Sequence, residues 1–204
     1  MAEAHLTARD DILAAIRNRR VKSAPRPALY RAPAVDGDLA EQFAARARAI
    51  YAEVEIVDSE SDIAGAIASI LRDKNLPARI HVPPASALTA HTGNLETLTT
   101  PPGPDDAALA HVPFGIAETG TLVNAAGEGT PASWHFRAGL EIAVIHARDI
   151  LPHMENALAK LKQRGDLPNT INFVSGPSRT GDIEQTMELG AHGPKALAIL
   201  IVRG

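Results

Sequence analysis

The 204-residue sequence contains no cysteine. Disulfide bonds, cysteine-ligated iron–sulfur clusters, cysteine-type zinc sites and cysteine nucleophiles are therefore excluded for these residues. Aromatic residues are also scarce, at 3% of the chain. Folding of a chain of this length hides roughly 70% of the surface of the unfolded chain, so one soluble domain with a small appendage needs no covalent staple.

Long apolar runs are missing as well. The longest one spans residues 196–202, far short of the ~20 residues that a membrane helix requires. Residues 1–20 mix acids and arginines with apolar residues, which is not the pattern of a signal peptide. We therefore expect a cytoplasmic protein with no membrane partner.

Positive charge is concentrated at the beginning of the chain. Residues 1–50 carry a formal charge of +3 and the remainder carries −7. Residues 17–31 hold six basic residues, two prolines and no acid, which is typical of an extended connector. Such a segment either docks on an acidic partner or nucleic acid, or is a solvated linker. Because only Tyr30 supplies a stacking aromatic, the linker is favoured and no nucleic-acid partner is expected.

Helical and strand patterns alternate along the chain. Residues 1–37 are predicted to form an N-terminal helix, over residues 8–19, with a connector rich in proline and arginine, and residues 38–204 an α/β domain. The helices predicted in that domain cover residues 38–50, 59–72, 150–163 and 182–189, with one helical turn at 105–109. The predicted strands cover residues 54–57, 79–82, 95–98, 141–146, 170–174 and 196–202.

This alternation predicts a mainly parallel sheet with helices on both faces, because parallel neighbours need crossover connections that helices usually provide. In such sheets ligands bind beyond the carboxyl ends of the strands. The loops after Ala126, His146 and Val174 are therefore the places where a site is expected.

A polar loop, Ser175-Gly-Pro-Ser-Arg-Thr-Gly181, follows the strand at residues 170–174. Its glycine spacing is that of a P-loop, but Asp182 stands where a lysine belongs, and the loop is one residue too long for a serine-hydrolase elbow. An anion site at the start of the next helix remains, formed by Ser175, Gly176, Ser178, Arg179 and Thr180. Alternatively, Ser178 or Thr180 caps that helix and Arg179 pairs with a nearby acid.

Glu118 lies between two apolar runs, in Glu118-Thr-Gly-Thr121. An apolar setting favours the neutral form of a carboxyl group, so Glu118 is a candidate general base or nucleophile. Thr119, Gly120 and Thr121 are candidate ligand-binding residues beside it. The alternative is a turn with Gly120 at its tip, the acid being solvated or paired with Arg179.

The eight histidines show no metal-ligand spacing, so no metal site is expected. His192, within residues 190–194, is a candidate acid or base near neutral pH, or else a helix C-terminal cap. Trp134-His135-Phe136 is either a lid or partner anchor, or a hydrophobic plug under a long loop.

Three stretches together resemble one family. Residues 117–123 (AETGTLV), 175–185 (SGPSRTGDIEQ) and 190–194 (GAHGP) are similar to the LUD domain of the lactate-utilisation protein C (LutC/YkgG) family, over roughly residues 110–204. The resemblance implies a NagB/RpiA/CoA-transferase-like fold and a role in oxidising L-lactate to pyruvate beside partner subunits that carry iron–sulfur clusters.

Without cysteine, this chain is then expected to be a non-redox subunit that contributes binding, gating, assembly or substrate handling, with no cofactor of its own. Two other functions stay open. One is an independent enzyme of the CoA-transferase-like class that uses Glu118 and the anion-binding loop. The other is a pure interaction module.

Overall fold

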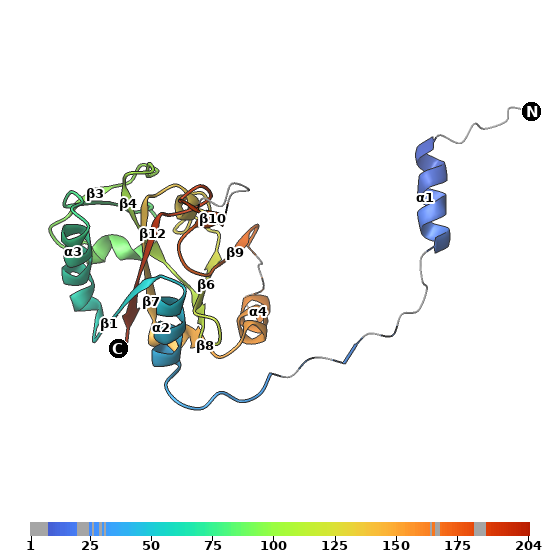
Figure 1. The fold of residues 1–204 in the computed structure, drawn as a ribbon, viewed down its shortest axis with the longest axis horizontal. Coiled ribbons are helices and arrows are strands. Elements are labelled where there is room, and N and C mark those ends of the chain that lie inside the picture. Colours follow the sequence, from blue (N-terminus) through green and yellow to red (C-terminus); the bar gives the residue numbers. More distant parts are fainter. Residues whose placement is uncertain are drawn as a thin grey trace, which may run out of the picture. The chain divides into compact units, whose positions relative to one another are not determined.

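The computed structural model describes residues 8–19, 25, 27–28, 30, 32–163, 165, 168–181 and 187–204 (Figure 1). The chain divides into two compact units, residues 1–32 and 33–204. The first unit contains helix α1 (Ala8–Arg19), which confirms the predicted helix, and none of the residues of α1 is buried.

The second unit is built on a six-stranded sheet in the order β1-β12-β7-β4-β2-β3, whose strand pairs are all parallel. The predicted α/β fold with a mainly parallel sheet is therefore confirmed. The strands are β1 (Glu53–Val57), β2 (Arg79–His81), β3 (Glu96–Leu98), β4 (Ala107–His111), β7 (Leu140–His146) and β12 (Ala196–Val202).

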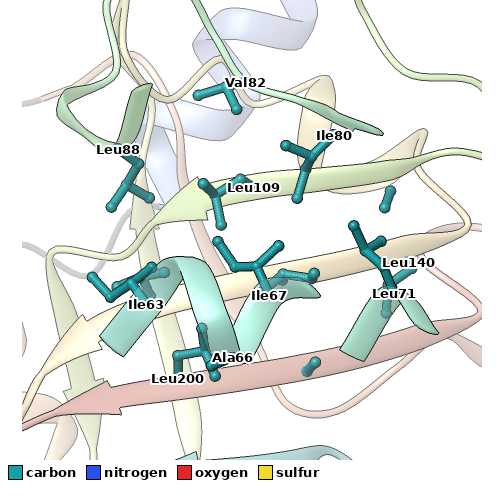
Figure 2. Close-up of a cluster of buried hydrophobic side chains, with 14 of the residues drawn as sticks. Ile63, Ala66, Ile67, Leu71, Ile80, Val82, Leu88, Leu109, Leu140 and Leu200 are labelled. Atoms are coloured by element: carbon teal, nitrogen blue, oxygen red, sulfur yellow. The ribbon is translucent and has the colours of Figure 1, made fainter. Parts of the chain in front are cut away.

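The two faces of this sheet are covered by different elements. Alternate residues of a strand point to opposite faces, so Ile142 and Val144 of β7 join one apolar cluster while Ala143 and Ile145 join another. Helix α3 (Ile63–Asp73) supplies the first cluster, shown in Figure 2. Helix α2 (Leu39–Ala49) supplies the second.

Helix α2 begins where the sequence predicts. The carboxylate of Asp38 accepts hydrogen bonds from the backbone N–H groups of Ala40, at 2.8 Å, and Glu41, at 3.3 Å. Arg203, next to the end of β12, donates to Asp38 and Glu41. Arg203 thus ties the start of the helix to the last strand of the sheet. Its hydrogen bond, followed by those from the two backbone N–H groups, lowers the pKa of Asp38.

A second sheet has the order β8-β5-β6-β9 and mixes parallel and antiparallel pairs. Its strands are β5 (Phe114–Ile116), β6 (Thr121–Ala125), β8 (Ile150–Leu151) and β9 (Ile171–Val174). Leu122 packs toward α2 and the large sheet, whereas Val123 packs toward α4 (Met154–Gln163). The second sheet thus lies between the large sheet and α4.

The remaining elements are short. Strands β10 (Arg179–Gly181) and β11 (Met187–Leu189) form a two-stranded antiparallel ribbon. The four 3-10 helices in the described residues are η1 (Glu60–Asp62), η2 (Ala87–His91), η3 (Trp134–Phe136) and η4 (Ala147–Asp149).

Three predictions of local structure are wrong. Residues 105–109 are not a helical turn, because residues from Ala107 onward form β4 between β7 and β2. The helix predicted from Ile150 begins only at Met154, because Ile150 and Leu151 pair with β5 ahead of Pro152. Of the helix predicted over residues 182–189, the last three residues are strand β11, and residues 182–186 lie outside the described residues.

The predicted connector at residues 17–31 falls mostly outside the described residues, and its first residues belong to α1. None of the helices in the described part of the chain is both long and apolar enough to cross a membrane. Within the same residues, no group of three or more metal-ligating side chains of histidine, aspartate and glutamate could hold a metal ion.

Candidate functional site

An open cleft of about 310 Å³ lies between η3 and the segments on either side of the β10-β11 ribbon. Its lining comprises His135, Phe136, Phe173, Val174, Ser175, Gly176, Ser178, Arg179, Thr180, His192, Gly193 and Pro194. All five residues predicted for the anion site and the candidate His192 therefore share one hollow. No acidic side chain occurs among the described lining residues.

The cleft is not at the expected end of the large sheet. Residues 192–194 precede β12 and η3 precedes β7, so both lie near the amino ends of these strands. The loop after Val174 and part of the loop after Ala126 do line the cleft, but the loop after His146 does not. The physical reason is that β6 and β9 belong to the second, mixed sheet, where the carboxyl-end rule for parallel sheets does not apply.

Ser178, just before β10, is hydrogen-bonded to the segment that follows β11. Its backbone N–H donates to Pro194 at 2.9 Å, and its carbonyl accepts from Gly190 at 3.2 Å. Its hydroxyl oxygen accepts from the backbone N–H of His192 at 3.3 Å. The serine of the polar loop is therefore fixed against residues 190–194, which brings two of the family-like stretches into one structure.

Arg179 gives the cleft its permanent positive charge. Its guanidinium lies 3.5 Å from the centroid of the Tyr51 ring, in a cation–π contact. The anion site was predicted at a helix N-terminus, but residues 179–181 pair with residues 187–189 as strands. Any attraction for an anion comes instead from the guanidinium, the hydroxyls of Ser175, Ser178 and Thr180, and the His192 imidazole.

His192 has an exposed side chain and lines the cleft. The alternative in which it caps the end of a helix is wrong, because the preceding Met187–Leu189 is a strand.

The turn at residues 118–121 joins β5 to β6, and the hydroxyls of its two threonines form contacts within the protein. The hydroxyls of Thr119 and Thr121 lie 2.6 Å apart, and that of Thr121 lies 2.8 Å from the Ser175 hydroxyl. Gly120 has a φ of +67°, and a Cβ there would collide with the backbone of Arg46 and Ala47 in α2. Thr121 therefore contacts the lining residue Ser175, but residues 118–121 do not line the cleft themselves.

Glu118 lies outside the cleft lining and pairs with His153, with 2.9 Å between Oε2 and Nδ1. The other ring nitrogen, Nε2, donates to the Pro33 carbonyl at 2.7 Å. The Glu118 carboxylate, and after it the Pro33 carbonyl, raise the pKa of His153 because both accept hydrogen bonds from the protonated ring. The Glu118 side chain is 54% exposed, so the apolar setting assumed for a reactive carboxyl group is not found.

Sequence reasoning missed the buried polar cluster of Asn124, His135 and Glu141. His135 Nδ1 lies 2.7 Å from Glu141 Oε1 and 3.3 Å from the Asn124 amide nitrogen. The three residues are 1–3% exposed. The signal was present in the sequence, since Glu141 interrupts an apolar strand and a charge in such a position is seldom buried unless it is paired.

Residues 105–202 match the family model described as the LUD domain. This part of the chain is therefore similar to the LUD domain. The resemblance stated from the three motif stretches is thereby confirmed. All the lining residues of the cleft lie within the matched residues 105–202.

Several curated proteins that are similar to part of this chain are named lactate utilization protein C. The protein of Geobacillus sp. (strain WCH70) is 34% identical over 91 residues, covering 43% of this chain and 38% of the relative. That of Halalkalibacterium halodurans is 32% identical over 101 residues, covering 48% and 44%. The matched region thus spans about two fifths of the length of these relatives.

A crystal structure of a DUF162 family protein from Deinococcus radiodurans has a similar fold. Its TM-score is 0.64, with 23% sequence identity, covering 83% of this chain and 99% of that chain. The shared fold therefore extends beyond residues 105–202 into the first half of this chain.

Proposed function

We propose that this chain takes part in lactate utilization as a non-redox component that binds a small carboxylate in the cleft. The observation that carries the proposal is that residues 105–202, which match the LUD domain, contain every lining residue of the cleft, in a chain that is similar to proteins named lactate utilization protein C. The partners are proteins that carry iron–sulfur clusters and accept the electrons of the oxidation, since these 204 residues offer no cysteine to hold a cluster.

The chemistry of the cleft fits a carboxylate. Arginine matches the planar geometry of a carboxylate with paired N–H donors, and the cation–π contact with Tyr51 restrains the Arg179 guanidinium. A volume of about 310 Å³ is at the lower end of the range for small-molecule sites. Lactate and pyruvate are small enough to enter.

Growth tests the physiological role. A strain without the gene should fail to grow on L-lactate, should grow normally on pyruvate, and should recover when the gene is returned. Undiminished growth on L-lactate contradicts the proposal.

Two arginine variants test the cleft in the same strain. Arg179→Gln should fail to restore growth because it removes the lining guanidinium. Arg148→Gln is the matched control, because that arginine is 67% exposed and lies outside the described cleft lining. If both variants restore growth equally, the cleft is not needed for lactate utilization.

Binding by the purified protein is measured by thermal shift with L-lactate and pyruvate. A ligand at about 100 times its Kd stabilises the folded state by about 2.7 kcal/mol, which raises Tm by about 5–10 °C in a protein of this size. Arg179→Gln should lose this shift. No shift for the wild-type protein with either acid favours the interaction module over a binding subunit.

Partner identity needs a separate measurement. The tagged chain, purified from cells grown on L-lactate, should retain partner proteins that contain iron and acid-labile sulfide, whereas the chain produced alone should contain neither. Glu118→Gln should leave growth on L-lactate intact, because Glu118 lies outside the cleft lining. Loss of growth with that variant would instead favour the independent enzyme that uses Glu118.

A further inference from the structure

The buried cluster of Asn124, His135 and Glu141 lies where the two sheets face each other. Glu141 shares a face of β7 with Ala143 and Ile145, which pack toward the second sheet. Asn124 comes from β6 of that second sheet, and His135 from η3. A carboxylate, an imidazole and an amide thus replace the apolar side chains that fill the rest of this layer.

Each member of the cluster has a polar atom without a hydrogen-bond partner in the described protein. These atoms are Asn124 Oδ1, His135 Nε2 and Glu141 Oε2, all shielded from solvent. Buried polar atoms almost always have partners in folded proteins. Three such atoms in one cluster mark a place where a ligand group or an ordered water can supply the missing hydrogen bonds.

His135 lines two separate hollows. The first is a small cavity of about 10 Å³, whose lining includes His135 and Glu141. The second is the outer cleft of about 310 Å³. His135 is the residue that the two described linings have in common. The small cavity has room for one water-sized group, such as a hydroxyl, while the outer cleft has room for the rest of a small acid.

The hydrogen bond to Glu141 determines which ring nitrogen of His135 is an acceptor. The Glu141 carboxylate accepts a hydrogen bond from Nδ1–H at 2.7 Å, so the Asn124 amide nitrogen, 3.3 Å from the same Nδ1, does not donate to it. In the neutral ring Nε2 therefore carries the lone pair. A carboxylate that fixes the tautomer of a histidine in this way prepares the opposite nitrogen to accept a proton or a hydrogen bond.

We propose that His135, oriented by Glu141, is the specificity-determining end of the carboxylate site and accepts a hydrogen bond from the hydroxyl of a 2-hydroxy acid. The proposal rests on the proposed function, in which the cleft holds the carboxylate of the same ligand near Arg179. His135 touches the ligand, and Glu141 is a positioning residue that acts through the His135 ring.

The test compares the Kd values of L-lactate and propionate, which has the same carbon skeleton and carboxylate but no hydroxyl. The wild-type protein should bind L-lactate about tenfold more tightly, the value of roughly one hydrogen bond. In His135→Asn, the amide nitrogen can still donate to Glu141 but no acceptor stands in the place of Nε2. The preference for L-lactate should then fall to about twofold or less, with the Kd for propionate nearly unchanged.

His192→Asn is the matched control, since His192 is the other histidine in the described cleft lining. That variant should weaken both acids alike and keep the preference. A preference that survives in His135→Asn overturns the inference, as does equal binding of the two acids by the wild-type protein. In both cases the carboxylate site stands. Binding of neither acid by the wild-type protein overturns the proposed function and the inference together.

A measurement on the wild-type protein covers the case in which His135→Asn does not fold. In nitrogen-15 NMR spectra, His135 should show a protonated Nδ1 and an unprotonated Nε2. Addition of L-lactate should shift the Nε2 resonance, and addition of propionate should not. An Nε2 chemical shift that does not change when L-lactate is added overturns the inference, and so does a proton on Nε2 in the neutral ring.

Discussion

Gly120 lies at the tip of the turn between β5 and β6, and the substitution Gly120→Ala tests what the turn requires. Its φ of +67° is in the left-handed region, where a residue with a Cβ costs about 1–2 kcal/mol. A Cβ at this position would also collide with the Ala47 backbone nitrogen and the Arg46 carbonyl carbon. Since these are backbone atoms of α2, they cannot move aside as a flexible side chain does.

The expected loss of stability combines both effects. Overpacking of this kind costs about 1–3 kcal/mol, which brings the total for Gly120→Ala to about 2–5 kcal/mol. This is a large part of the 5–15 kcal/mol, roughly, that stabilises a typical domain. We expect a folded protein with a clearly lower unfolding midpoint in urea.

Gly165→Ala separates strain from collision. Gly165 has a φ of +84°, but no described atom lies within 4 Å of the position of its Cβ, so only the cost of the left-handed backbone applies. Gly181→Ala has neither a left-handed φ nor a close neighbour among the described residues and should stay within about 0.5 kcal/mol of the wild type. If Gly120→Ala costs no more than Gly165→Ala in urea unfolding, the turn is not packed against α2 as described.

Three further changes test other parts of the fold. The raised pKa of His153 means that its pair with Glu118 stabilises the fold fully below the unfolded value of about 6.5. This contribution is lost as pH rises through the raised folded value, so the Tm difference between wild type and Glu118→Gln should shrink as the pH rises above about 6.5. Asp38→Ala should cost about 1 kcal/mol in urea unfolding through loss of the helix cap, more than Arg203→Ala, which breaks exposed pairs worth about 0–1 kcal/mol. Ile67→Ala should cost about 2–5 kcal/mol because the side chain is fully buried under the sheet, and a smaller loss would contradict the packing in Figure 2.

The central sheet could be predicted because its strands are marked by local pattern. The run of apolar residues from Ala196 to Val202 is buried nearly throughout, which is typical of a strand covered on both faces. The prediction of a helical turn at residues 105–109 was wrong because that segment is rich in alanine, which has the highest helix propensity. In the structure, Ala107, Ala108 and Ala110 are buried in β4, so pairing with β7 outweighs that local preference.

The ribbon of β10 and β11 could not be predicted in the same way. Arg179 pairs with Leu189, ten positions further along the chain, and neither strand shows a long apolar alternation. Short strands such as these are stabilised by pairing and by contacts from outside, including the hydrogen bonds between Ser178 and residues 190–194. In the sequence, Ser178 and Thr180 were instead interpreted as possible caps of a helix.

The cleft was only partly predictable. The loop residues from Ser175 to Thr180 were found because hydroxyls, glycines and an arginine are concentrated there. One open hypothesis, an independent enzyme, combined Glu118 with the loop that contains Arg179. In the structure Glu118 pairs with His153, which is 35 positions away and carries no sequence signal for that contact. The rule that drew attention to Glu118, a charge within an apolar run, applies with more force to Glu141, which is 1% exposed.

The position of Glu141 argues for a role beyond folding. A buried carboxylate costs several kcal/mol of desolvation, and apolar replacements of buried ion pairs are often neutral or stabilising. Along the same face of β7, Ala143 and Ile145 show that apolar residues fill this layer well. Folding alone therefore gives little reason to keep an acid there. A ligand that needs an oriented histidine at the inner side of the cleft does give one, because without the carboxylate the His135 tautomer would be undefined.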